Sequence, residues 1–166
     1  STIAPSTGKW YWEVKVVNKA ALPLIGIAKS DWNLTYPGNT STSIGYASNG
    51  EIYSAGNNEG AYGATYTTGD IIGVALDMDS TALTFYKNGV SQGAVSSVFT
   101  ASDFIFPAFS GQTSDVLSIN FGNGYFGTTA VSSAQNPDDG IGIFEYDVPT
   151  GYYALNTKAI NAQEYD

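Results

Sequence analysis

The amino-acid sequence predicts an all-β protein, and three observations support this prediction. Apolar residues alternate with small or polar residues over 71–78 and again over 82–87, which is the two-residue period of a strand with one buried face. Similar short segments recur at intervals of roughly ten residues, separated by turn-forming residues. The chain holds 19 glycines among its 166 residues and has no stretch with the helical period, so we expect no helix.

Eight strands are expected. In chain order they are Lys9–Val17, Leu24–Lys29, Ser43–Ala47, Glu51–Ser54, Ile71–Met78, Ala82–Lys87, Phe104–Phe109 and Val116–Phe121. In the first of them Trp10 and Trp12 fall on one face and Glu13 on the other, so the tryptophans are expected in the core and Glu13 at the surface. By the same alternation, Leu76 and Phe85 are expected to be core residues on neighbouring strands.

Short polar residues and glycine predict two tight turns. The carboxylates of Asp77 and Asp79 can accept hydrogen bonds from the backbone of their own turn. Asn88-Gly89 is the dipeptide best suited to a two-residue turn, and Gly89 is expected at positive φ. The longer connections are polar and are expected to be loops; they are Ser30–Thr42, Ala55–Thr68 and Gly111–Asp115.

Composition excludes several classes of function. With 15 acidic and 6 basic residues, a net charge of −9 argues against nucleic acid and against an anionic membrane surface as partners. The absence of Cys and His removes disulfides, thiolate metal sites, cysteine nucleophiles and the commonest general base. We expect no cofactor and no metal, and no apolar run approaches the roughly 18 residues of a spanning helix.

The length predicts one domain, and because the chain opens without Met we expect a mature form or a piece of a longer protein.

The acidic residues raise two alternatives. Paired carboxylates on a β-sandwich can serve a polysaccharide depolymerase, and the candidates are Glu13, Glu51, Asp77 and Asp79. Turn formation or a surface position explains these four more simply. Calcium ligands are offered by Asn136, Asp138 and Asp139, and by Asn57–Glu59. Neither group has the twelve-residue EF-hand spacing, so solvated loops are the preferred interpretation.

Four groups of residues occur in the order found in one known family. They are Gly8–Val14 with Ile25–Ala28, Ile44–Tyr46 with Tyr53, Gly69–Gly89 with Gly93, and Phe106–Phe109 with Leu117–Gly122. In this order the motifs resemble the SPRY domain over residues 8–126. The resemblance implies a bent antiparallel β-sandwich, a concanavalin-like jelly roll, that binds partners through loops at one end and is not an enzyme.

The rest of the chain is expected to extend that sandwich. We assign residues 1–126 to the SPRY core and 127–166 to a C-terminal extension that packs on or closes the same domain. Within the extension, Gly151–Lys158 and Ile160–Gln163 resemble the segment that follows SPRY domains in tailed-phage and environmental viral proteins. This second resemblance implies a virion component, located in the virion or outside the cell.

The SPRY resemblance places partner recognition in two loops. The candidates are Trp32, Tyr36 and Asn39 in the first loop, Gln112 and Thr113 in the second, and Tyr62 and Tyr66 in the loop over 57–68. Aromatic rings beside amides suit both sugar stacking and protein contacts, and packing in the core is the alternative for each ring. Peptide-binding members carry Trp followed by Gly in the second loop, where this chain is polar. Their asparagine-containing peptides are therefore not expected as ligands.

These observations lead to one main hypothesis and two alternatives. The main hypothesis is a non-enzymatic recognition or assembly module of a phage particle that binds a host-surface glycan or protein through loops at one end of the sandwich. In the first alternative, the module is structural and decorates or docks onto other virion subunits. In the second, it is a polysaccharide depolymerase.

Overall fold

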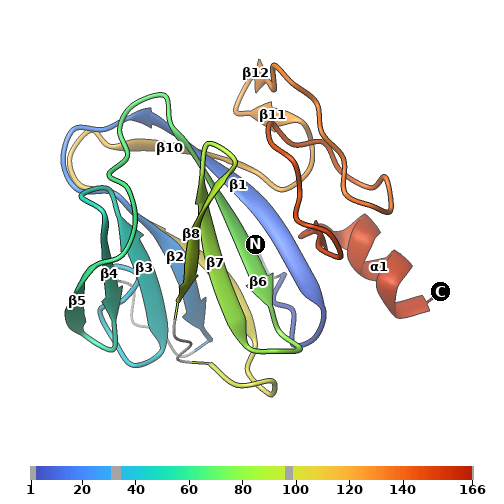
Figure 1. Ribbon diagram of the computed structural model, residues 1–166, viewed down its shortest axis with the longest axis horizontal. Helices are drawn as coiled ribbons and strands as arrows, with labels where there is room; N and C mark the ends of the chain where they lie inside the picture. Colours follow the sequence, from blue (N-terminus) through green and yellow to red (C-terminus); the bar gives the residue numbers. More distant parts are fainter. Residues whose placement is uncertain (1–2, 31–34, 96–98, 166) are drawn as a thin grey trace.

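The computed structural model describes residues 3–30, 35–95 and 99–165 and shows two β-sheets packed face to face (Figure 1). The elements are β1 (Lys9–Asn18), β2 (Leu24–Lys29), β3 (Ser43–Ala47), β4 (Glu51–Ser54), β5 (Asn57–Ala61), β6 (Ile71–Asp77), β7 (Ala82–Lys87), β8 (Val90–Val95), β9 (Ile105–Ser110), β10 (Val116–Asn120), β11 (Tyr125–Phe126), β12 (Thr129–Ala130), β13 (Tyr153–Ala154) and α1 (Thr157–Tyr165). All eight predicted strands are present, each within one residue of its predicted ends. The predicted all-β sandwich is confirmed.

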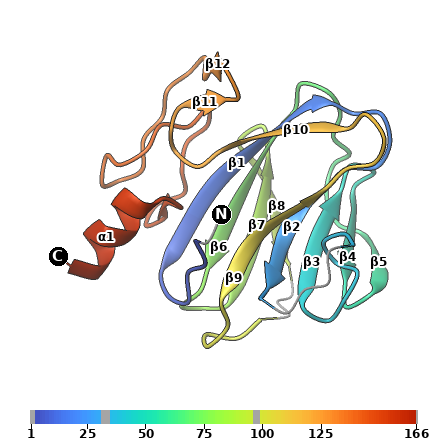
Figure 2. The same cartoon turned by 180° about the vertical axis from the view of Figure 1, so that it is seen from behind.

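The two sheets differ in how the strands are ordered. One, called here the six-stranded sheet, has the order β10-β1-β6-β7-β8, with β13 also paired to β1. The other, the five-stranded sheet, has the order β5-β4-β3-β2-β9, and its strands can be followed side by side in Figure 2. Strands far apart in sequence, such as β2 and β9, are therefore neighbours, which brings the loops next to them together.

The core lies between the two sheets. Trp12 on β1, Leu76 on β6 and Phe85 on β7 are fully buried, so the prediction that Leu76 and Phe85 are core residues is confirmed. From the five-stranded sheet, Tyr46 places its ring centroid 5.3 Å from that of Phe85. Contacts of this kind between large apolar side chains supply most of the stabilisation of a β-sandwich.

Both predicted turns are present, but the Asp79 carboxylate, expected to accept from its own turn, accepts instead from the backbone N–H of Gly8 at 2.8 Å. Asn88 and Gly89, between β7 and β8, have φ angles of 49° and 79°, as a two-residue hairpin turn requires. Between β6 and β7, Asp77 Oδ1 accepts hydrogen bonds from the backbone N–H groups of Asp79 and Ser80, each at 3.0 Å. The positive φ predicted for Gly89 is confirmed.

Besides the two-residue strands β11, β12 and β13, two longer strands were not predicted, β5 and β8. Each is the outer strand of its sheet, and the side chains of both are mostly exposed. An edge strand that leaves both faces in solvent carries no alternation of apolar and polar residues. The sequence pattern that located the other strands is therefore absent from these two.

The helix α1 contradicts the expectation that the chain has no helix. Asn156 begins it, because its side-chain Oδ1 accepts a hydrogen bond from the backbone N–H of Ala159 at 2.9 Å, the geometry of a helix N-cap. The helix has nine residues, which is too short for a helical period to stand out in the sequence. Within the described residues, no helix has the length and apolar character needed to span a membrane.

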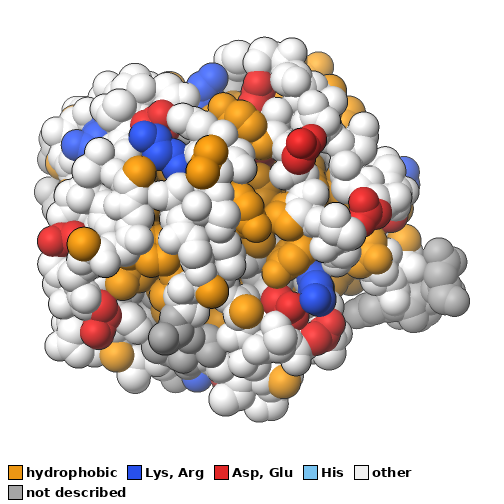
Figure 3. Space-filling model, viewed as in Figure 1, with side chains coloured by type: hydrophobic (Ala, Val, Ile, Leu, Met, Phe, Trp, Pro, Cys, Tyr) orange, Lys and Arg blue, Asp and Glu red, His pale blue; other side chains and the backbone are white. Residues whose placement is uncertain are grey.

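The segment after β10 covers part of the outer face of the six-stranded sheet, and runs beside β1 in both ribbon views (Figures 1 and 2). Figure 3 shows hydrophobic side chains reaching the surface over this sheet, beside the C-terminal segment. Phe144, which is fully buried, packs edge-on to Tyr11 with ring centroids 5.1 Å apart.

Because the segment after β10 covers this face of the sheet, the prediction that Glu13 lies at the surface is wrong. Glu13 is fully buried, because the C-terminal segment lies across the face of β1 that the alternation had assigned to solvent. Its carboxylate accepts hydrogen bonds from the backbone N–H groups of Glu145 and Tyr146, each at 2.9 Å. Asn120 Nδ2 is 3.4 Å from the same carboxylate, and burial raises the pKa of Glu13 to about 7.

Candidate functional site

A hollow of about 360 Å³ lies on the outer side of the five-stranded sheet. Its lining residues come from four places in the chain and are Leu22, Leu24, Thr35, Tyr36, Tyr53, Ser110, Gly111 and Gln112. The loop before β3 supplies Tyr36, and the loop between β9 and β10 supplies Gln112. The two loops that the SPRY resemblance selected therefore meet at this hollow.

Glycine residues allow the first loop to lie directly on the sheet. A Cβ atom on Gly45 of β3 would be 2.2 Å from the backbone oxygen of Pro37, and one on Gly38 would be 2.3 Å from that of Tyr53. Gly38 also has a φ of 92°, which L-residues rarely adopt. The backbone N–H of Gly38 donates to Ser43 Oγ at 2.9 Å. These close contacts hold the backbone that carries Tyr36.

Two tyrosines form one wall of the hollow. Tyr36 in the loop and Tyr53 on β4 lie edge to face, with ring centroids 6.1 Å apart and planes at 90°. Leu22 and Leu24 add apolar surface beside them. Aromatic rings with an apolar floor give large contact area at low cost in side-chain entropy, which is typical of binding surfaces.

The second loop is held by the carboxylate of Asp115. Its Oδ1 accepts hydrogen bonds from the backbone N–H groups of Ala20 and Ala21 at 2.7 and 2.8 Å, and its Oδ2 accepts one from Gln112 at 2.9 Å. Burial opposes ionisation, but the three hydrogen bonds outweigh it and hold the pKa of Asp115 below its ordinary value. The Gln112 side chain is exposed at the rim of the hollow, where it can reach a bound partner.

The remaining predicted residues of these two loops lie around the hollow or outside the residues that the structure describes. Asn39 is partly exposed and its backbone N–H donates to the Tyr36 carbonyl at 3.0 Å, so it shapes the loop without lining the hollow. Thr113 is exposed next to Gln112. Trp32 lies outside the described residues.

Tyr66 has a structural position. It is 2% exposed, and its hydroxyl lies 2.9 Å from the backbone oxygen of Pro23 and 2.8 Å from that of Tyr46. Burial raises the pKa of Tyr66 well above its ordinary value. A ligand at the surface has no access to this ring, so the structure favours packing, the alternative weighed for Tyr66.

Tyr62 packs against the core and supports the edge strand β8. Its hydroxyl donates to the backbone oxygen of Gly93 and accepts from the backbone N–H of Phe85 at 3.3 Å. Its ring lies 5.2 Å from that of Tyr46, and burial raises its pKa to about 12. Tyr62 therefore fixes the bulged edge of the six-stranded sheet and does not line the hollow.

Six of the eight lining residues were missed as site residues, and Tyr53 and Leu24 are the large ones that lie on strands. Tyr53 lies on the face of β4 opposite to the buried Ile52, and Leu24 is the first residue of β2. The alternation within β4 indicates that Tyr53 points away from the core. Its closeness to Tyr36 depends on how the loop before β3 folds back, which no local pattern reveals.

The carboxylates considered for catalysis are spread over the molecule. Glu13 is buried under the C-terminal segment, and Asp77 holds the β6–β7 turn. Asp79 accepts a hydrogen bond from the backbone of Gly8, and Glu51 lies on β4 of the other sheet. No two of them face each other across the hollow. Within the described residues, no group of three or more His, Cys, Asp or Glu side chains is placed to hold a metal ion.

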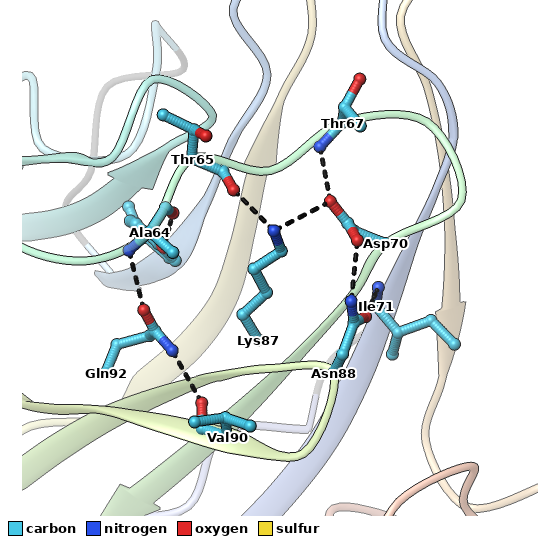
Figure 4. Close-up of polar contacts among 10 residues, drawn as sticks. Ala64, Thr65, Thr67, Asp70, Ile71, Lys87, Asn88, Val90 and Gln92 are labelled. Carbon is cyan, nitrogen blue, oxygen red and sulfur yellow. Dashed lines mark hydrogen bonds and ion pairs between the residues drawn. The ribbon is translucent and has the colours of Figure 1, made fainter.

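A polar cluster around Asp70 is a second place where charged groups gather (Figure 4). Asp70 Oδ1 accepts from Asn88 Nδ2 at 2.7 Å, and its Oδ2 accepts from the backbone N–H of Thr67 at 2.8 Å. Lys87 Nζ lies 3.4 Å from Asp70 Oδ2 and donates to the backbone oxygen of Thr65 at 2.8 Å. Because these groups satisfy one another, the cluster ties the loop before β6 to the β7–β8 turn and leaves no open binding group.

The structure is a β-sandwich with a hollow where two loops meet beside one sheet. Residues 9–124 match the model of the SPRY domain, and the chain belongs to this family. Similar proteins include the E3 ubiquitin-protein ligase RKP of Arabidopsis thaliana, 29% identical over 149 residues, which are 86% of this chain and 10% of that protein.

Two further relatives match shorter stretches. The Ran-binding proteins 9/10 homolog of Drosophila melanogaster is 33% identical over 95 residues, 55% of this chain and 10% of that protein. The dual specificity protein kinase splA of Dictyostelium discoideum is 36% identical over 96 residues, 56% of this chain and 4% of that protein. The matched region thus spans a tenth or less of each of these three relatives. All three are eukaryotic, so they lend no support to the expected phage origin.

Proposed function

We propose that this chain is a protein-binding module and that its partner binds in the hollow formed by Tyr36, Tyr53 and Gln112. SPRY domains are protein-interaction modules. The observation that carries the proposal is the meeting of the two loops on one sheet face, where they enclose about 360 Å³ with two tyrosines and an exposed amide at the rim.

The chemistry of the hollow fits a peptide side chain with its flanking backbone. The tyrosine rings and the leucines offer apolar contact area, and Gln112 offers both a donor and an acceptor. The described part of the first loop, from residue 35 on, and the second loop are held by hydrogen bonds within the chain, so these parts need little further ordering when a partner binds. The spread of the candidate carboxylates over several elements supports a binding role rather than a catalytic one.

The finer expectations stay predictions from the sequence. A surface glycan, a place in a phage particle and docking onto other virion subunits receive no support from the relatives, which are eukaryotic proteins. Tyr36 and Tyr53 pack edge to face against each other, and this arrangement favours a side chain that packs beside the pair over a sugar ring that stacks on one exposed face.

A peptide-display experiment tests the proposal. A random-peptide library is selected on the wild-type domain, and selected peptides are synthesised and measured on Tyr36→Ala and Gln112→Ala by calorimetry. Tyr36→Ala should weaken binding by about 1–2 kcal/mol, the range of interface hot spots, with little change in melting temperature. Tyr125→Ala is the matched control, because this tyrosine is 47% exposed on β11, away from the hollow. Peptides that bind wild type and Tyr36→Ala equally would place the binding surface elsewhere.

A further inference from the structure

We propose that the side chain received by the hollow is an arginine of an extended peptide, with its guanidinium group directed at Glu51. This inference rests on the proposed function and adds the chemistry of the partner. It is carried by the position and hydrogen bonding of Glu51, which stands two residues before Tyr53 on the same face of β4.

Glu51 is held in place by neutral groups only. Its Oε2 accepts from Asn49 Nδ2 at 2.6 Å and from Asn58 Nδ2 at 2.9 Å, and lies 3.4 Å from the Tyr53 hydroxyl. None of the hydrogen bonds within the described residues reaches Oε1. The carboxylate is therefore oriented by its neighbours while one of its oxygen atoms is left to accept from a partner.

Among the residues that the structure describes, no cation forms an ion pair with this carboxylate. The described ion pairs join Lys9 to Asp77, Lys29 to Asp103 and Lys87 to Asp70, and none includes Glu51. The whole chain carries a net charge of −9, and Glu59 is exposed on the adjacent strand β5. The field at this end of the five-stranded sheet therefore favours a positively charged partner.

Arginine fits this arrangement better than lysine does. A planar guanidinium can donate to a carboxylate while its face lies against a tyrosine ring, and Tyr53 stands between the hollow and Glu51. The methylene stem of arginine can lie along the apolar surface of Leu22 and Leu24. A lysine ammonium is a point charge that makes the ion pair without the planar contact.

The selection described above also tests this inference. Peptides selected on wild type should be enriched in arginine at one position relative to the starting library, and selection on Glu51→Gln should lose that enrichment. Replacing this arginine by citrulline, which has nearly the same shape without the charge, should weaken binding to wild type about tenfold or more. On Glu51→Gln the same replacement should change binding little.

Controls separate this inference from the proposed function. Glu59→Gln removes the same charge from the neighbouring strand and should keep the arginine preference. With added salt, the affinity of wild type for the arginine peptide should fall steeply, whereas its affinity for the citrulline peptide should not. This measurement needs no variant of the protein. Peptides that are sensitive to Tyr36→Ala but lack arginine, or bind equally well with citrulline, would overturn the arginine assignment alone. Peptides insensitive to Tyr36→Ala would overturn both.

Discussion

Removing the buried carboxylate of Glu13 should change how the stability of the protein depends on pH. Glu13 lies on β1 under the C-terminal segment and accepts backbone hydrogen bonds from Glu145 and Tyr146. Burial raises its pKa from 4.5 to about 7, and the nearby Glu145 charge acts in the same direction, while the hydrogen bonds, including that from Asn120, act against it. The folded state therefore binds a proton on Glu13 more tightly than the unfolded state does.

The sign and the size of the effect follow from that difference. Since the folded-state pKa is the higher one, the contribution of Glu13 is most favourable below pH 4.5 and is lost as the pH rises through 7. A tenfold change in proton affinity is worth about 1.4 kcal/mol, so the full loss is about 3 kcal/mol. About half of it falls between roughly pH 5.5 and 7. The carboxylates whose pKa is lowered by the fold, such as Asp77 and Asp115, act at lower pH and with the opposite sign.

Urea unfolding at several pH values between about 5.5 and 7 measures this loss. In wild type the free energy of unfolding should decrease as pH rises, and in Glu13→Gln the decrease should be absent. At the acidic end of this pH range the variant should also be less stable than wild type by about 1–3 kcal/mol. The amide nitrogen of glutamine cannot accept a hydrogen bond, so one backbone N–H group loses its acceptor. Glu59→Gln serves as the charge-matched control on an exposed strand. Parallel pH profiles of wild type and Glu13→Gln would refute the assignment, as would a carboxyl NMR titration of Glu13 with a midpoint near 4.5.

Three further predictions concern stability. Leu76→Ala should lower the free energy of unfolding by about 2–5 kcal/mol in urea titrations, since the side chain is fully buried; an unchanged value would remove Leu76 from the core. Gly89→Val should cost at least about 1 kcal/mol, because Gly89 has a φ of 79° and its new Cβ would lie 2.9 Å from Tyr146 Cδ1; a melting temperature equal to wild type would contradict this. A protein ending at residue 126 should fail to give a cooperative thermal transition by circular dichroism, because Glu13 would lose both backbone donors. A transition like that of wild type would show that the segment after residue 126 is not needed for folding.

The sequence predicted the strands that turn an apolar face to the core, including β6, which is buried on both faces. The alternation around Leu76 and Phe85 and the turn at Asn88-Gly89 are local signals, and the structure confirms them. The edge strands β5 and β8 bury little on either face and so carry no such signal. The helix α1 is stabilised by one cap and one short buried face, which is too little for a period to emerge.

The surface position predicted for Glu13 was wrong, and the positions of Glu13, Tyr62 and Tyr66 have a common physical origin. Alternation shows that two faces differ, but it does not show whether a distant segment covers the polar one. Glu13 is covered by a segment that arrives more than a hundred residues later, and the two tyrosines follow a loop that returns to the core. Contacts between residues far apart in the sequence determine all three positions, and a single sequence does not reveal such contacts.

For the candidate site, the sequence and the family resemblance located the two loops but only part of their lining. Tyr36 and Gln112 lie where they were expected, at one hollow. Tyr53 joins them because Gly38 and Gly45 allow the loop to lie on the sheet. Glu51, considered first as a catalytic carboxylate, acquires its proposed role only through its position beside Tyr53.

The central claim is that the hollow at Tyr36, Tyr53 and Gln112 is where this domain binds a partner protein. Mapping a selected peptide by NMR on the isotope-labelled domain tests it most directly. The largest shift changes should fall on Tyr36, Tyr53 and Gln112 and on the side chains next to them. Changes concentrated instead on the C-terminal segment around Tyr125 and Glu145, with these three residues unmoved, would contradict the claim.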